Sequence, residues 1–147
     1  MNVGIYIYDQ AEVLDFSGPF EVFSTASRIC TSEDPFRVFL IGETGEVVKA
    51  RGGFSVTPSY GFHNHPHINI LIIAGGVHIE EMTKSQVIDW ISKVAKNAKL
   101  VASVCTGAFL LAEARILTTQ NVTTHWEDIP DLRKSYPVSE LSCRFSI

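Results

Sequence analysis

The feature that most constrains the fold is a run of aliphatic residues in the middle of the chain. Residues 68–74 read Ile-Asn-Ile-Leu-Ile-Ile-Ala. A strand with apolar side chains on both faces needs cover on both faces, as in the parallel sheet of an α/β protein. The run is far shorter than the roughly 18 residues that indicate a membrane span. It therefore predicts a buried strand with helices on either side.

Strand and helix signals alternate along the rest of the chain. Pro19 is predicted to be the first residue of the first helix, because proline suits that position. The pair at 52–53, Gly-Gly, predicts a hairpin turn between short strands. This alternation predicts a single α/β sandwich around a mainly parallel sheet. The remaining strands are predicted at 3–8, 36–41, 100–104 and 141–145, and the other helices after residue 83, over 107–114 and over 130–135.

The composition excludes several classes of protein. Of the 147 residues, 46% are hydrophobic and 19% are charged, which supports a packed core rather than a disordered chain. The net charge is −4 and no basic cluster is present, so we expect this domain itself to bind no nucleic acid. The start of the chain does not resemble a signal peptide. Three cysteines without a Cys-x-x-Cys motif (Cys30, Cys105 and Cys143) favour the reducing cytoplasm over a disulfide framework.

The strongest functional signal is a cysteine between a predicted strand and a predicted helix. Cys105 follows the strand over 100–104, and the helix begins at Gly107. This layout is typical of a nucleophile elbow, which lifts a reactive side chain above the edge of a sheet. Gly107 would give the turn room, and the helix start would favour the thiolate and lower the pKa of the cysteine. The alternative is a buried structural cysteine at the end of a strand.

Two other predicted turns carry candidate site residues. Gly75 and Gly76 follow the aliphatic strand, where glycine lets backbone amides approach a ligand and form an oxyanion hole. A plain turn is the simpler explanation of the pair. Asp15 is expected between the first strand and the first helix, among apolar residues. A carboxyl group in such surroundings tends toward a raised pKa and can exchange a proton near neutral pH; alternatively, Asp15 or Ser17 caps the helix.

Taken together, these segments resemble the DJ-1/PfpI superfamily, whose domains are class I glutamine amidotransferase-like. The resemblance covers essentially the whole chain and is carried by residues 102–108 (Ala-Ser-Val-Cys-Thr-Gly-Ala), 123–126 and 14–23. The pattern is similar to the branch that holds isocyanide hydratases and the amidotransferase-like domains of AraC-type regulators. It implies a flavodoxin-like sandwich, a homodimer, no cofactor and a small-molecule substrate or ligand. It also implies Cys105 as nucleophile, with Asp15 beside it and Thr106 after it, as in the hydratase members.

His125 is a further candidate, because cysteine and histidine can form a catalytic dyad. The order His-Trp-Glu over 125–127 resembles the His-x-Glu of amidotransferase triads, but in those enzymes that motif lies much further downstream of the cysteine. PfpI-type proteases carry histidine directly after the nucleophile, where this chain has Thr106. We therefore expect His125 in the wall of the substrate pocket, with direct catalysis as the alternative.

Histidines also alternate at positions 63, 65 and 67, in a polar loop that contains Pro66. Alternation could place the three imidazoles on one side of an extended segment. No cysteine or carboxylate completes a ligand set, and a loop before a strand explains the pattern simply. We expect no metal site.

The resemblance leaves three functions open. In a hydratase, Cys105 would attack the terminal carbon of an isocyanide, Asp15 would shuttle the proton, and water would release an N-substituted formamide. The amides of Gly76 and Thr106 would stabilise developing charge. In an AraC-type regulator, the domain would bind a small ligand without turnover. A DJ-1-like redox or deglycase-type protein is the third possibility, although that branch has glutamate rather than aspartate beside the cysteine.

The end of the chain departs from the family pattern. Family domains continue after the segment that matches Arg144-Phe145 with a strand, a glycine-rich turn and a long helix, whereas this sequence ends at Ile147. We expect one domain over residues 1–147 that lacks this C-terminal strand and helix. Without that helix, one face of the sheet would expose aliphatic side chains, so we expect poor solubility of the chain as a monomer.

Overall fold

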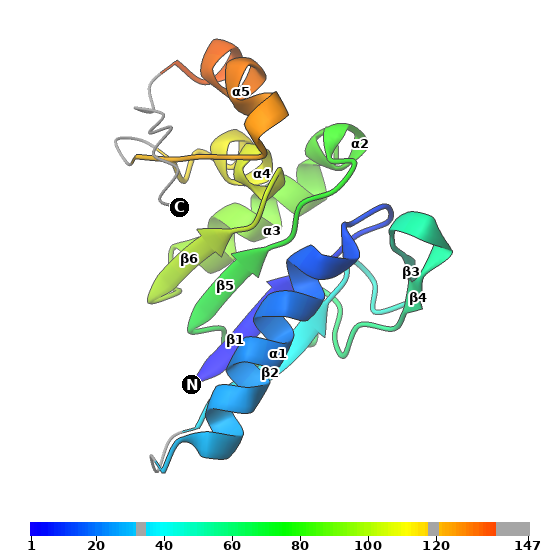
Figure 1. Cartoon of the computed structure of the whole chain (residues 1–147), viewed down its shortest axis with the longest axis vertical. Helices are drawn as coiled ribbons and strands as arrows, with labels where there is room; N and C mark the ends of the chain where they lie inside the picture. The colour runs from blue at the N-terminus through cyan, green and yellow to red at the C-terminus, as the bar shows by residue number, and fades with distance from the viewer. Residues whose placement is uncertain (32–34, 118–120, 138–147) are drawn as a thin grey trace.

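A four-stranded parallel sheet forms the centre of the protein. The computed structural model describes residues 1–31, 35–117 and 121–137. The sheet has the order β2-β1-β5-β6, which follows the flavodoxin-like pattern when the hairpin β3–β4 is set aside (Figure 1). This confirms the predicted mainly parallel α/β fold; the strand predicted at 141–145 lies outside the described residues. The strands are β1 (Asn2–Tyr6), β2 (Arg37–Ile41), β5 (Ile70–Ile73) and β6 (Leu100–Ser103).

The aliphatic run of the sequence forms the inner strand β5. Ile72 lies opposite Ile5 of β1 on one side and opposite Ala102 of β6 on the other. All four residues of β5 are buried. This burial on both faces explains why the strand reads as a continuous apolar run rather than as an alternating one.

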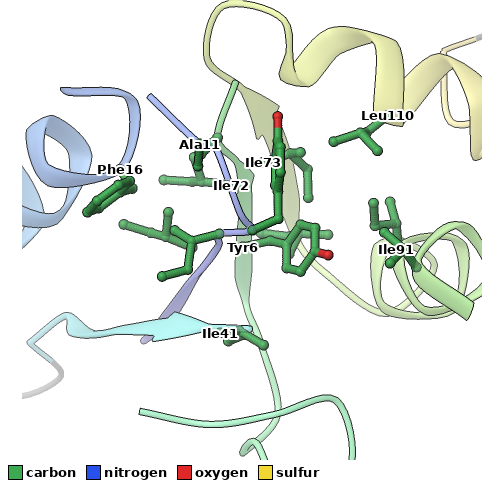
Figure 2. Packing of buried hydrophobic residues seen from close by; sticks show 14 of the residues in the cluster. Tyr6, Ala11, Phe16, Ile41, Ile72, Ile73, Ile91 and Leu110 are labelled. Carbon is green, nitrogen blue, oxygen red and sulfur yellow. The ribbon is translucent and has the colours of Figure 1, made fainter. Parts of the chain in front are cut away.

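Helices cover both faces of the sheet. Helix α1 packs on β1 and β2, while α4 packs on β5 and β6 and contacts α3. Figure 2 shows Phe16 of α1 on one side of the sheet and Ile91 and Leu110 on the other. These side chains fill one continuous apolar core. The helices are α1 (Val13–Ile29), α2 (Ile79–Met82), α3 (Ser85–Ala95), α4 (Gly107–Glu113) and α5 (Ile129–Ser135), and α5 follows the 3-10 turn η2 (Trp126–Asp128).

The predicted hairpin is present between β2 and β5. Strands β3 (Val48–Lys49) and β4 (Ser55–Val56) pair in antiparallel fashion around the turn η1 (Arg51–Gly53). Gly52 and Gly53 both have positive φ, 69° and 79°, which glycine adopts without strain.

The start of α1 corrects the sequence prediction. The helix begins at Val13 rather than at Pro19, so Asp15 lies in its first turn instead of in a loop. Proline cannot supply the N–H that the Asp15 carbonyl would accept in a regular helix. The added turn buries Phe16, which is 3% exposed, against the core. We attribute the earlier start to this burial, which outweighs one missing backbone hydrogen bond.

No helix within residues 1–31, 35–117 and 121–137 is long and apolar enough to cross a membrane.

Candidate active site

The first turn of α1, the glycine turn after β5 and the turn between β6 and α4 meet beyond the carboxyl ends of β5 and β6. Functional residues of open α/β sheets gather at this end of the strands. A Cβ atom on Gly75 would lie 2.6 Å from Oδ2 of Asp15, 2.7 Å from the nitrogen of Thr106 and 2.9 Å from Cβ of Cys105. No side chain other than hydrogen fits between these groups. Gly75 is therefore the point around which Asp15 and Cys105 come together from elements far apart in the sequence.

Cys105 occupies a tight turn between β6 and α4. Its φ is 51°, in the left-handed region that a residue with a side chain seldom adopts. The amide of Gly107 closes the turn by donating to the Val104 carbonyl at 2.9 Å. A Cβ atom on Gly107 would lie 2.3 Å from the carbonyl oxygen of Ile73, so α4 can approach β5 this closely because residue 107 is glycine. This is the backbone geometry of a nucleophile elbow.

The side chain of Cys105 lies beside the carboxyl group of Asp15, because a Cβ atom on Gly75 would be within 3 Å of both. Asp15 is buried and also accepts a hydrogen bond from the amide of Gly75, with an N–O distance of 3.1 Å. Burial raises the pKa of Asp15, as expected from its apolar neighbours; the Gly75 amide acts in the opposite direction. Asp15 and Cys105 therefore place a buried carboxyl group beside a partly exposed thiol.

The expected lowering of the cysteine pKa is wrong. Burial raises the pKa of the Cys105 thiol, and the negative charges of Asp15 and Asp128 raise it further. The backbone N–H of Thr106 donates to the sulfur and acts in the opposite direction, but it does not outweigh desolvation. The helix start therefore lowers the pKa of the Cys105 thiol less than burial raises it.

The hydroxyl of Thr106 bridges both polar groups of Gly76. It accepts from the Gly76 amide at 2.8 Å and donates to the Gly76 carbonyl at 2.9 Å. Since the Gly75 amide already donates to Asp15, both amides of the glycine pair are engaged by side chains. This differs from the expected oxyanion hole, because Asp15 and Thr106 reach back to the turn and take the donors themselves.

A short segment before η2 borders the other side of Cys105. The hydroxyl of Thr124 donates to the Cys105 carbonyl at 3.0 Å and so supports the turn. The partly exposed ring of His125 lies near Asp15, where its positive form would lower the pKa of that carboxyl. Nε2 of His125 is 3.3 Å from Oε2 of Glu127. Within the described residues, no hydrogen bond joins His125 to Cys105, whereas the carboxyl group of Asp15 lies beside Cys105 across Gly75.

Two residues near the site were missed in the sequence. Tyr8 is 3% exposed, and its hydroxyl lies beside Thr106 without a well-formed hydrogen bond among the described residues. Burial raises its pKa, and the negative charges of Glu81 and Asp15 add to this effect. His78 is buried two residues after Gly76 and stacks on Phe109, with ring centres 4.4 Å apart. Tyr8 belongs to a β-rich run and His78 to a turn, and neither sequence context predicts that the residue lies near the site.

Among residues 1–31, 35–117 and 121–137, no group of three histidine, cysteine or carboxylate side chains is placed to hold a metal ion.

The structure is that of an α/β protein with a parallel sheet and a cysteine at a strand-to-helix elbow. Residues 1–142 match the model of the DJ-1/PfpI family, and the chain belongs to that family. A solved THiJ/PfpI family protein from Pseudomonas syringae shares the fold with a TM-score of 0.84 at 19% identity. That match covers 97% of this chain and 57% of the other.

The curated relatives include both regulators and an enzyme. The chain is 25% identical over 99% of its length to the HTH-type transcriptional regulator GbdR of Pseudomonas aeruginosa, of which it covers 40%. It is 28% identical over 86% of its length to the isonitrile hydratase of Pseudomonas putida, of which it covers 53%. An uncharacterized protein in the cpoL 5' region of Streptomyces lividans is 32% identical, with 92% of this chain and 95% of that protein covered. The chain thus spans about half the length of GbdR and of the isonitrile hydratase, and nearly the whole length of the Streptomyces lividans protein.

Proposed function

We propose that the protein hydrates a small isocyanide to an N-substituted formamide, with Cys105 as the nucleophile. The observation that carries this proposal is the placement of the Cys105 side chain beside the buried carboxyl group of Asp15, on either side of Gly75. The Asp15 carboxylate is therefore placed to accept a proton from the sulfur and to pass it on. The likeness to the Pseudomonas putida isonitrile hydratase supports the same substrate class.

The first step adds the thiol across the terminal carbon of the isocyanide. The sulfur of Cys105 forms a bond to this carbon while the thiol proton passes to Asp15 and from there to the same carbon. The product is a thioimidate, R–N=CH–S–Cys105. Water then adds to the thioimidate carbon, the C–S bond breaks, and the thiol regains a proton as the formamide leaves. Every atom of substrate and water is accounted for, and no cofactor enters.

The engaged glycine amides fit this reaction better than amide hydrolysis. Hydrolysis of an amide creates an oxyanion, which needs free donors. In the isocyanide addition the attacked carbon receives both the sulfur and the proton, so no oxyanion forms in that step. Asp15 delivers the proton to this carbon, so free backbone amides are not needed to stabilise a negative charge in this step. Thr106 acts as a positioning residue that holds Gly76 and, through its amide, the sulfur.

The test is turnover of an aryl isocyanide, followed by the formyl proton of the formamide in NMR. The intact chain should form product, and Cys105→Ala should form none. Asp15→Asn should reduce the rate by about 10²-fold or more, because it removes the proton shuttle. Cys30→Ala is the matched control, since that exposed free thiol lies at the end of α1 and should leave the rate unchanged. Activity that survives Cys105→Ala, or no turnover by intact protein, refutes the proposal.

A second candidate is a ligand-sensing domain, as in an AraC-type regulator. The observation that favours it is the closed hydrogen-bond arrangement, in which both Gly75 and Gly76 amides are already satisfied. The similarity to the regulator GbdR points in the same direction. A thermal shift on adding the isocyanide, with no formamide after prolonged incubation, would select this function over catalysis. Oxidation chemistry of the DJ-1 type ranks third, because Asp15 stands where that branch carries glutamate.

The proposal includes a homodimer in the cytoplasm. Helix α1 exposes Leu14, Val22 and Ile29, whose spacing places them along one side of the helix. An exposed apolar stripe of this kind is suited to cover by a second copy. The free thiols at Cys30 and Cys105 suit a reducing compartment. Sedimentation of the intact chain at micromolar concentration tests the dimer.

A further inference from the structure

A pocket lies near the amino end of β5, whereas Cys105 lies beyond the carboxyl ends of β5 and β6. It is formed by the segment that precedes β5 and by the last turns of α3, and it has a volume of about 370 Å³. This volume falls within the range of about 300–1,000 Å³ that is common for small-molecule sites. The proposed function makes no use of this pocket.

The floor of the pocket is flat and apolar. Phe62 and Trp90 stack with ring centres 4.3 Å apart and an angle of 12° between their planes. Both side chains are buried, and Ile68 and Val94 extend the apolar surface beside them. Such a floor suits the face of a ring or a short hydrocarbon body.

His65 fixes this floor in place. Its Nε2 accepts a hydrogen bond from Nε1 of Trp90 at 3.0 Å, and its Nδ1 lies 2.8 Å from the Pro66 carbonyl. An imidazole that accepts at Nε2 carries its proton at Nδ1, which matches a bond donated to the carbonyl. Both nitrogens are therefore engaged, and His65 is a positioning residue for Trp90 rather than a ligand for a metal ion.

The rim of the pocket carries positive or hydrogen-donating groups. His63, His67, Lys93 and Asn97 line it, and no residue of the lining is acidic. Within the described part of the chain, the Lys93 ammonium makes no ion pair, and the rings of His63 and His67 make no hydrogen bond. In a chain with net charge −4, this is a local excess of unpaired donors.

We propose that this pocket binds a small organic anion. Its flat apolar body would lie on the Phe62–Trp90 floor, and its carboxylate or phosphate group would meet Lys93, His63 and His67. The charged group gains charge-assisted hydrogen bonds at the rim, while the apolar body gains burial on the floor. The site is separate from Cys105, so it does not depend on the proposed hydration reaction.

Trp90 provides the reporter for the test. The sequence has two tryptophans, and the second, Trp126, is 61% exposed on η2. The variant Trp126→Phe with Cys105→Ser leaves Trp90 as the single tryptophan, which is excited selectively over the four tyrosines, and removes the thiol at Cys105. Benzoate, phenyl phosphate and the neutral benzyl alcohol are titrated into this variant. The pocket should give a saturable change in Trp90 fluorescence with one or both anions, and at least roughly tenfold weaker binding of benzyl alcohol.

Rim variants in the same background decide the role of charge. Lys93→Gln should weaken anion binding severalfold, and adding His63→Gln and His67→Gln should weaken it by about tenfold or more in total. Lys96→Gln is the matched control, because it removes a charge just beyond the same helix but outside the lining. The rim side chains are exposed, so a circular dichroism spectrum should confirm folding of each variant.

Three results would overturn the proposal: no saturable change with either anion, equal affinity for benzoate and benzyl alcohol, or anion affinity unchanged in the triple rim variant. The relative affinities of benzoate and phenyl phosphate identify which anionic group the rim prefers. Formamide production by the unaltered chain is scored separately, so failure of one proposal leaves the other standing.

Discussion

The turn that carries Cys105 leaves no room for a side chain at Gly107, and one added methyl group tests the elbow. In Gly107→Ala, Cβ would lie 2.3 Å from the Ile73 carbonyl oxygen and 3.0 Å from that of Ala74. Both oxygens belong to the main chain at the end of β5, so no flexible side chain can move aside. Relief requires α4 to shift by roughly 1 Å relative to the strand.

The size of the effect follows from these contacts. Overpacking of this kind costs about 1–3 kcal/mol. The Ile73 carbonyl also accepts from the Val104 amide at 3.0 Å, and disturbing that bond costs about 1 kcal/mol more. The preference of helices for alanine over glycine offsets up to about 1 kcal/mol. We expect Gly107→Ala to lower the free energy of unfolding by about 2–3 kcal/mol.

Gly18→Ala is the matched control for this substitution. Gly18 lies inside α1, and apart from its chain neighbours and its own helix nothing lies within 4 Å of a Cβ atom built there. The helix preference for alanine is opposed by crowding against the ring of Pro19, so the same methyl group should change the free energy of unfolding by less than about 1 kcal/mol. Urea unfolding of both variants and the unaltered chain gives the comparison, with an unchanged slope expected for a true stability effect. If Gly107→Ala unfolds at the same urea concentration as the unaltered chain, the contact that defines the elbow is refuted.

Two further predictions concern the buried polar groups. Iodoacetamide should alkylate Cys105 more slowly than free cysteine near pH 8, because burial and the Asp15 charge raise the pKa of the thiol and leave less thiolate. The alkylation rate, followed by peptide mass spectrometry, should rise with pH. Asp15→Asn should move this rise to lower pH, because it removes the negative charge beside the thiol. If the alkylation rate of Cys105 in the unaltered chain rose at a lower pH than that of free cysteine, this prediction would be contradicted. Tyr6→Phe should destabilise by about 1–3 kcal/mol in urea unfolding, because the buried Glu81 carboxylate loses the Tyr6 hydroxyl. Tyr60→Phe, which loses an exposed bond to Arg37, should cost less than about 0.5 kcal/mol; equal costs would show that the Glu81 contact contributes little.

The parts of the fold that follow from local pattern were predictable from the sequence. The aliphatic run around Ile72 implied an inner parallel strand, and the order strand, Cys105, Gly107, helix implied the elbow. Asp15 shows why other parts of the fold were not predictable from local pattern. Whether a helix starts at Val13 or at Pro19 depends on how much Phe16 gains by packing on a sheet that the local sequence does not describe.

The hydrogen bonds of the site depend on residues distant in the chain. Asp15 and Gly75 are 60 positions apart, and Thr106 and Gly76 are 30 apart. A glycine pair reads the same in a sequence whether its amides are free or engaged. The direction of the Cys105 pKa is likewise a balance between burial and one amide, and only the assembled environment sets that balance.

The left-handed backbone at Cys105 has a consequence for how this position can change over time. A residue with a side chain pays about 1 kcal/mol or more to hold φ near 51°, whereas glycine adopts it freely. A single nucleotide change converts a cysteine codon into a glycine codon. A lineage that no longer used the sulfur would therefore find a more stable sequence one mutation away. Persistence of cysteine at this turn would then be a record of selection on the thiol itself, independent of any assay.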